Sequence, residues 1–332
     1  MPLAPLTLAM LDALLDSGET PSLFSDQPCV LLDLTQPPGP RGPRHARRLH
    51  GLRTLPAPVI GLGNPDRHSP LAEACDVVVA SMTEAAPLID RIATTPIAAA
   101  VFVQLLRATE GLPLDAALFA ESLAYSTLQA GPEYQAWLAV NRAAEPAQPD
   151  DPGPAVDIQR DGPRLTLWLN RPSNRNAMSR EMRDALIEAL NLVRLDLSAE
   201  QVIIAGRGAC FSTGGDLSEF GTAPDPATAH LVRSLALPGR ALAACAERVA
   251  ARLHGACVGS GIEFPAFAHR VEANHNAWFQ LPELRFGLIP GAGGCVSIPR
   301  RIGRQRTAWM VLSGARVDAA TAHAWGLVDA LV

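Results

Sequence analysis

Two glutamates stand beside glycine-containing segments in the C-terminal part of the chain. Glu263 ends the run Gly259-Ser260-Gly261-Ile262-Glu263, Glu283 follows Leu281-Pro282, and a further glycine pair, Gly214-Gly215, lies upstream. Two carboxylates can hold a water molecule between them, and backbone N–H groups from two glycine-bearing turns can converge on one developing oxyanion. We therefore interpret these residues as one candidate active site.

The composition predicts a globular chain without nucleic-acid-binding character. The 332 residues are 48% hydrophobic, which is enough for one large domain or for two smaller ones with cores of their own. The net charge is −5 and only 5% of the residues are aromatic. A surface that follows phosphates or stacks on bases needs clustered basic and aromatic side chains, so we expect no nucleic acid partner.

Neither the start of the chain nor its cysteines indicate export. Met1-Pro2-Leu3-Ala4-Pro5 lacks a cationic segment, and no uninterrupted apolar run reaches the length of a membrane span. We therefore expect a cytoplasmic protein with no membrane partner. The six cysteines have no Cys-x-x-Cys spacing, which favours buried, reduced thiols over a zinc site or disulfides. The chain has no lysine, which excludes Schiff-base catalysis.

A proline-rich, acidic segment, residues 145–154, divides the chain. It has almost nothing apolar to bury and therefore predicts a linker. The linker separates an N-terminal region, residues 1–144, from a core, residues 155–332.

In the N-terminal region, the patterns predict short strands followed by helices. After a first helix at 6–15, we expect strands at 30–34, 58–62 and 76–80, and then helices over 85–107, 114–129 and 132–142. Residues 37–53, where arginines alternate with prolines, are expected to form a loop.

In the core, strand patterns alternate with helical ones. Strands are expected at 165–169, 201–206 and 248–253, Ser179 is expected to cap a helix, and another helix is expected to begin at Glu263. This alternation predicts an α/β layered domain with functional residues in the loops at strand ends.

Four ordered segments of the core resemble the crotonase superfamily, also called the enoyl-CoA hydratase/isomerase family. They are residues 170–179, 206–217, 255–263 and 279–294, and residues 298–303 and 324–329 extend the similarity toward the C-terminus. The resemblance covers about residues 155–332. It implies an α/β fold with a ββα spiral core, here with an N-terminal α/β and helical extension, and a trimer or a hexamer of paired trimers.

The resemblance also implies an acyl-CoA thioester as the substrate and partner. No metal and no separate cofactor are expected, because CoA is part of the substrate. By position in the motifs, the backbone N–H groups of Gly215 and Ser260 would form the oxyanion hole. Gly215 lacks a Cβ, so a ligand can approach closely, and Ser260 lies near a helix start, where N–H groups lack intrahelical partners.

Glu263 and Glu283 match the two positions that hold the catalytic water in relatives that hydrate enoyl-CoA. In this interpretation, one carboxylate takes a proton from water as oxygen adds to C3, and a proton is delivered at C2 of the enolate. Without the resemblance, the favoured interpretation of Glu263 is an acid in the first turn of a helix, and the alternative for Glu283 is a loop acid after a proline.

The CoA path is expected along two segments. By resemblance, Asn174–Ala177 and Ser212–Gly214 would line it, with Arg175, Asn176, Ala177, Ser212 and Gly214 as CoA-binding residues. Arg175 is the candidate for a phosphate contact, because guanidinium pairs well with phosphate oxygens. We expect Asp216 to cap the following helix and His254 and Cys257 to be packing residues.

Three local departures from the family pattern bear on the site. Ser260 replaces a glycine, Pro265 follows Glu263 and has no N–H, and His269-Arg270 changes a local charge. We expect the helix near Glu263 to shift in response to Pro265.

The order of the segments is a further departure. The chain ends soon after residues 324–329, where relatives continue into a helical portion over the acyl end, and residues 84–142 resemble that portion. We hypothesise that residues 1–144 supply this lid; the alternative is an unrelated docking domain.

The sequence therefore predicts an acyl-CoA enzyme of fatty acid metabolism, an enoyl-CoA hydratase-like lyase. The alternatives are an enoyl-CoA isomerase, an acyl-CoA hydrolase, or a non-catalytic CoA-binding homologue.

Overall fold

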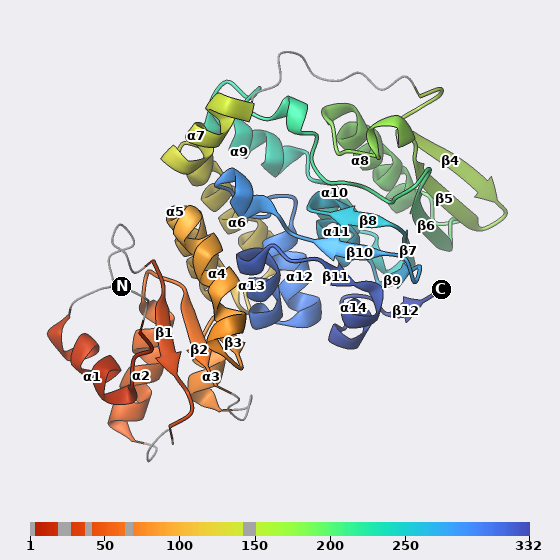
Figure 1. The fold of residues 1–332 in the computed structure, drawn as a ribbon. Helices are drawn as coiled ribbons and strands as arrows, with labels where there is room; N and C mark the ends of the chain where they lie inside the picture. The colour runs from red at the N-terminus through yellow and green to blue at the C-terminus, as the bar shows by residue number, and fades with distance from the viewer. Residues whose placement is uncertain (1–3, 19–27, 37–41, 64–68, 142–150) are drawn as a thin grey trace.

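The computed structural model describes residues 4–18, 28–36, 42–63, 69–141 and 151–332, and their strands form three sheets (Figure 1). The largest sheet has the order β12-β9-β7-β6-β5-β4, and its pairs are parallel except for the β4–β5 hairpin. Its strands are β4 (Val156–Asp161), β5 (Arg164–Leu169), β6 (Gln201–Gly206), β7 (Val249–Leu253), β9 (Arg270–Ala273) and β12 (Ala330–Leu331).

A smaller sheet stands beside the large one in the order β11-β10-β8 (Figure 1). Its strands are β8 (Ala256–Val258), β10 (Trp278–Gln280) and β11 (Val317–Asp318). The α-helices of the core are α8 (Arg180–Leu195), α9 (Pro226–Leu235), α10 (Pro238–Ala243), α11 (Ser260–Glu263), α12 (Gly294–Ile302), α13 (Arg304–Ser313) and α14 (Ala319–Trp325). Its 3-10 turns are η1 (Pro172–Asn174), η2 (Leu217–Glu219), η3 (Ala246–Arg248), η4 (Pro265–Phe267) and η5 (Glu283–Phe286).

The N-terminal region contains a parallel three-stranded sheet and seven described α-helices. The sheet has the order β1-β2-β3, and its strands are β1 (Val30–Asp33), β2 (Val59–Leu62) and β3 (Val77–Val79). The helices are α1 (Leu8–Ser17), α2 (Pro43–Thr54), α3 (Pro70–Ala74), α4 (Met82–Thr94), α5 (Pro96–Thr109), α6 (Leu114–Gln129) and α7 (Pro132–Asn141).

Local sequence explains why the central elements form. β6 reads QVIIAG and is buried from its second residue onward, as expected of a strand inside a parallel sheet. Ser179 caps α8 by accepting a hydrogen bond from the Met182 amide, as predicted. The apolar face of α8 covers the sheet through Met182, Leu186, Ala189, Leu190 and Val193, which are all buried.

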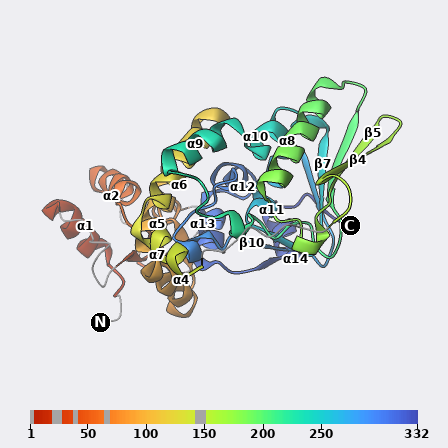
Figure 2. The same cartoon turned by 90° about the horizontal axis from the view of Figure 1, so that it is seen from above.

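The helices α4 to α7 pack directly on the core. α4 and α5 lie against α13, and α6 lies against α9 and α12 (Figures 1 and 2). One continuous hydrophobic cluster joins Leu88 and Phe102 of these helices to Leu167 and Val311 of the core. A separate cluster lies under α1, α2 and α3. The helical half of the N-terminal region therefore shares its core with residues 155–332.

Most predicted elements are confirmed, and three predictions are corrected. Residues 43–54, expected in a loop, form α2, because Leu49 and Leu52 pack on the second cluster. The expected helix 85–107 is two helices, broken before Pro96. Glu263 ends α11 instead of beginning a helix. The predicted linker lies outside the described residues except at 151–154.

No single helix among the described residues is both long enough and apolar enough to span a membrane. Only α4 and α5 together reach that length and apolarity, and the chain bends by 109° between them.

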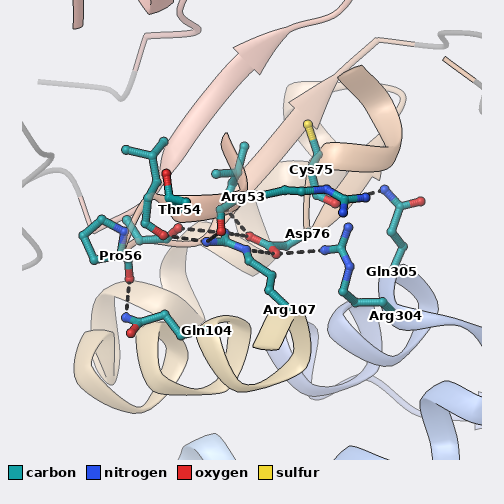
Figure 3. Close-up of polar contacts among 12 residues, drawn as sticks. Arg53, Thr54, Pro56, Cys75, Asp76, Gln104, Arg107, Arg304 and Gln305 are labelled. Atoms are coloured by element: carbon teal, nitrogen blue, oxygen red, sulfur yellow. Dashed lines mark hydrogen bonds and ion pairs between the residues drawn. The ribbon is translucent and has the colours of Figure 1, made fainter. Parts of the chain in front are cut away.

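A buried ion cluster joins the N-terminal sheet to the core (Figure 3). Asp76, next to β3, forms ion pairs with Arg107 of α5 and with Arg304 of α13, and it accepts a hydrogen bond from the Val59 amide at 2.8 Å. Arg107 also donates to the Leu55 carbonyl at 2.5 Å. Asp76 is 1% exposed, so its carboxylate balances two guanidinium groups that have little water around them.

Replacing Asp76 with asparagine is expected to destabilise the fold by about 3 kcal/mol, because it leaves the buried Arg107 without a counter-charge and Arg304 with only the exposed Glu110, at 3.8 Å. Urea unfolding would measure the change. Asp16→Asn is the matched control, since Asp16 pairs with Arg47 at an exposed site, where a pair contributes about 1 kcal/mol or less. Equal destabilisation by the two substitutions would contradict this role of Asp76.

Candidate active site

The loops that follow two neighbouring parallel strands lie against each other. β6 pairs with β7 in parallel, so the chain leaves both strands at the same edge of the sheet. Ser212 then bridges to Cys257, and a Cβ on Gly214 would lie 2.8 Å from the carbonyl oxygen of Val258. Only glycine permits this approach, and Gly214 also has a φ of +92°. The two glycine turns predicted from the sequence therefore meet.

Each of the two predicted oxyanion donors has a free amide. In the part of the chain that the structure describes, neither the N–H of Gly215 nor that of Ser260 donates to a protein acceptor. The isolated β-bridge between Met178 and Gly215 does not use the Gly215 amide. In this bridge the Met178 amide donates to the Gly214 carbonyl at 2.7 Å. Ser260 is the first residue of α11. Free amides from adjacent loops are suited to binding one oxyanion.

The two glutamates converge beside these amides. A Cβ on Gly259 would lie 2.7 Å from Oε1 of Glu283 and 3.8 Å from Oε1 of Glu263. Both side chains are buried, with 9% and 3% exposure respectively. Oε2 of Glu283 has no hydrogen-bond partner among the described residues, so this oxygen is available to a water molecule or a substrate proton.

Glu263 is held in place by the loop before α12. Its Oε2 accepts hydrogen bonds from the amides of Ala292 at 2.7 Å and Gly294 at 3.0 Å. A Cβ on Gly294 would lie 2.6 Å from Cγ of Glu263, so this contact requires glycine. The carboxyl group is therefore fixed by two amides with its other oxygen toward Glu283.

The two carboxyl groups differ in acidity. Burial raises the pKa of Glu263 to about 7, against the opposing effect of the Ala292 and Gly294 amides. Burial and then the charge of Glu263 raise the pKa of Glu283 well above its ordinary value. Burial and the charge of an ionised Glu263 thus both favour the protonated form of Glu283, and an ionised group beside a protonated one is the pairing that a base and an acid need.

The predicted CoA-binding residues lie together, but two of their side chains are committed to the fold. Asn176 accepts from the Arg171 amide and donates to three carbonyls of the Arg207–Phe211 turn. The hydroxyl of Ser212 donates to the Asn176 carbonyl and accepts from the Gly214 amide. The side chain of Arg175 is exposed, and the backbone of Arg175 and Asn176 is left-handed.

The three departures from the family pattern have local structural outcomes. The Ser260 hydroxyl is buried and has no partner among the described residues. α11 begins directly after Gly259, and Pro265 starts the turn η4 after α11 has ended, so its missing N–H interrupts no bond of α11. His269 and Arg270 are exposed, and Arg270 pairs with Glu272.

Other predictions for side chains near the site are confirmed. Asp216 caps η2 by accepting from the Ser218 amide. Cys257 is buried, and His254 contacts the Gly208 carbonyl. All six cysteines are free and buried.

One aromatic side chain of the N-terminal region packs among aromatic residues of the core beside Gly215. Trp137 of α7 lies 6.0 Å from Phe220 and 5.0 Å from Phe286, measured between ring centroids. A Cβ on Gly215 would lie 3.2 Å from the Phe220 ring, so this aromatic group lies next to the predicted oxyanion donor. Trp137 was not predicted as a site residue, because nothing local in the sequence relates it to Gly215.

Glu121 of α6 is a third buried carboxyl group at the site that the sequence analysis did not assign. It is 2% exposed and accepts from the amides of Gly293 and Cys295. One feature of the sequence could have identified Glu121. It is a charged residue on the buried face of an amphipathic helix, which also carries Ala117, Leu118 and Leu128.

Comparison with known proteins agrees with this fold. The sequence model of the enoyl-CoA hydratase/isomerase family matches residues 165–332. The chain is 35% identical over 165 residues to 2,3-dehydroadipyl-CoA hydratase of Escherichia coli, which covers 50% of this chain and 64% of that protein. It is 32% identical over 168 residues to 1,2-epoxyphenylacetyl-CoA isomerase of the same organism, covering 49% and 64%.

A solved structure shows the same core. A putative enoyl-CoA hydratase/isomerase from Mycobacterium abscessus superposes with a TM-score of 0.51 at 33% identity, covering 54% of this chain and 70% of that one. The fold and the site define an α/β protein with a crotonase-type core. The chain belongs to the enoyl-CoA hydratase/isomerase family, and it spans a little under two thirds of the length of each of the two curated relatives.

Proposed function

We propose that the protein adds water reversibly to a 2-enoyl-CoA thioester. The observation that carries this proposal is the pair of buried carboxyl groups, Glu263 and Glu283, which meet beside two free amides, those of Gly215 and Ser260. The family membership and the hydratases among the relatives support the same reaction class.

The reaction follows from this geometry. The amides of Gly215 and Ser260 bind the thioester oxygen and stabilise the enolate that forms there. The Glu263 carboxylate takes a proton from water as its oxygen bonds to C3, and the π electrons of the C2–C3 bond move to the thioester. The Glu283 carboxyl group then protonates C2. A proton passes from Glu263 to Glu283 to restore the starting state.

Two observations favour hydration over the alternatives. An isomerase or a thioester hydrolase that uses one glutamate would not need a second carboxyl group at the same place, whereas Glu283 has an oxygen without a protein partner beside Glu263. A non-catalytic homologue was suggested by Pro265 and by His269-Arg270. Pro265 leaves α11 intact, and His269 and Arg270 are exposed.

CoA would bind along the segments that the sequence analysis selected. The exposed side chain of Arg175 would contact a phosphate, and Ala177 and Gly214 would face the ligand from the turn that Asn176 and Ser212 hold in shape. The proposed reaction needs neither a metal nor a redox cofactor. A homotrimer or hexamer, a cytoplasmic location and a part in fatty acid metabolism stay predictions.

We also propose that α6 and α7 form the lid over the acyl group. Three close contacts support this role: Tyr125 lies on Gly291, Tyr134 on Gly287 and Leu138 on Gly221, and a Cβ on each of these glycines would come within 2.6 Å of its partner. In this proposal, residues 1–144 supply the cover that the resemblance places at the other end of the chain.

The reaction is tested with crotonyl-CoA as the probe. Hydration consumes the absorbance of the conjugated enoyl thioester without releasing free thiol, whereas a hydrolase releases thiol. A protein that binds CoA but turns over no thioester would overturn the proposal in favour of a non-catalytic role.

The pH dependence of kcat/KM is expected to be bell-shaped. Below pH 7 the rate should fall about tenfold per pH unit, because Glu263, whose pKa is raised to about 7, must be ionised to accept the water proton. At higher pH the rate should fall again, since the pKa of Glu283 lies well above its ordinary value and Glu283 must keep its proton. A rate that stays constant from pH 5 to 7 would contradict these roles.

A further inference from the structure

The N-terminus of α12 is bound by two carboxyl groups from distant parts of the chain. Glu263 of α11 accepts from the amides of Ala292 and Gly294. Glu121 of α6 accepts from the two amides that alternate with these, Gly293 at 2.7 Å and Cys295 at 2.8 Å. Four successive N–H groups, from 292 to 295, are thus shared between the two carboxyl groups.

This alternation couples the two side chains through the backbone. The amides that bind Glu121 alternate along the chain with the amides that bind Glu263. A movement of the first pair away from Glu121 would therefore move the second pair as well. Both oxygens of Glu121 are used, so the loop is held at two points. The charged or titratable groups facing Glu121 are Glu263 on α11, Glu283 on η5, Arg233 on α9 and Cys295 on α12.

We infer that Glu121 is a positioning residue for the base Glu263, acting through the 292–295 loop; this inference rests on the proposed function. Glu121 does not touch the reacting atoms in this account. It fixes the two amides that orient the Glu263 carboxylate and favour its ionised form. The base would consequently depend on a residue of the N-terminal region, and the lid would build the catalytic site as well as cover it.

Glu121→Gln is the direct test, since glutamine keeps the shape but turns an NH2 group toward one of the two amides. The loop should loosen, and Glu263 should lose part of the amide hydrogen bonding that lowers its pKa. The acidic limb of the kcat profile for crotonyl-CoA should move up by about one pH unit, and kcat at pH 7 should fall roughly 10- to 100-fold with KM nearly unchanged.

Glu133→Gln is the matched control. Glu133 accepts from the Ile97 and Ala98 amides at the start of α5, so it makes the same kind of two-amide contact on a different helix. The control should leave the acidic limb where it is. Glu121→Asp keeps a carboxyl group but is too short to reach both amides. It should also move the acidic limb of the kcat profile to higher pH, and it replaces Glu121→Gln as the test variant if that protein does not fold.

The pKa of Glu263 can also be measured without substrate, by carbon-13 NMR of the glutamate carboxyl groups. Its signal is assigned by its absence in Glu263→Gln. A higher pKa of Glu263 in Glu121→Asp, which keeps the charge that faces Glu263, supports the inference, and an unchanged pKa in this variant overturns it. A parent protein that hydrates no enoyl thioester would overturn the proposed function instead, so the two failures are distinguishable.

Discussion

Glu263→Gln is expected to lower kcat for the hydration of crotonyl-CoA by roughly 10²- to 10⁴-fold, the range that a general base contributes. Glutamine keeps the side-chain oxygen that faces the Ala292 and Gly294 amides, so the loop before α12 should keep its position. It cannot accept a proton from water. Steady-state kinetics should therefore show a lower kcat with little change in KM, because CoA and the oxyanion donors are untouched.

Glu283→Gln should give a loss of the same order, since C2 would then lack its proton donor. Glu188→Gln is the matched control: Glu188 is an exposed residue of α8, and its replacement should leave kcat unchanged. Turnover by Glu263→Gln at nearly the parental rate would remove Glu263 from the role of base. Loss in Glu263→Gln alone would point to the one-glutamate chemistry of an isomerase or a hydrolase.

Gly294→Ala is expected to lower kcat by roughly 100-fold, the loss that a displacement of about 1 Å can cause at a catalytic group. A Cβ at this position would lie 2.7 Å from Oε2 of Glu263, so the carboxylate must move away from its two amides. Gly294 is the first residue of α12 and does not have a positive φ, so alanine introduces no backbone strain there. The fold should consequently survive, and circular dichroism with steady-state kinetics would measure both quantities.

Gly42→Ala is the control for this substitution. A Cβ on Gly42 would meet no atom within 4 Å, and the backbone there is extended, with a φ of 176°. It should change neither kcat nor the thermal midpoint appreciably. A Gly294→Ala protein with parental kcat would show that the position of the Glu263 carboxylate does not limit the reaction.

The parts of the site that the sequence predicted are those determined by local chain geometry. Gly214, Gly215 and Ser260 follow strands whose apolar runs are readable, and parallel neighbours bring their loops to one edge of a sheet. Glu263 ends α11, the helix that begins at Ser260, and Glu283 begins the turn η5. The glycine-bearing turns and the two glutamates are visible in the sequence itself, and the resemblance to the enoyl-CoA hydratase/isomerase family supplied their predicted roles.

The sequence predicted a lid from the N-terminal region, but not the residues through which this region reaches the site, because those depend on long-range packing. Nothing near Glu121 in the sequence shows that its partners are the amides of Gly293 and Cys295, 172 and 174 residues away. The helix α2 was missed for a related reason: its arginines and prolines favour a loop locally, but Leu52 is fully buried against the N-terminal sheet.

The most direct test of the account is crotonyl-CoA turnover in water enriched with oxygen-18, followed by mass spectrometry of the products. Water addition predicts one labelled oxygen in the C3 hydroxyl group of an intact acyl-CoA, with the label incorporated roughly 10²- to 10⁴-fold more slowly by the Glu263→Gln protein. Label in a released carboxylic acid, or an isomerised thioester without label, would contradict it.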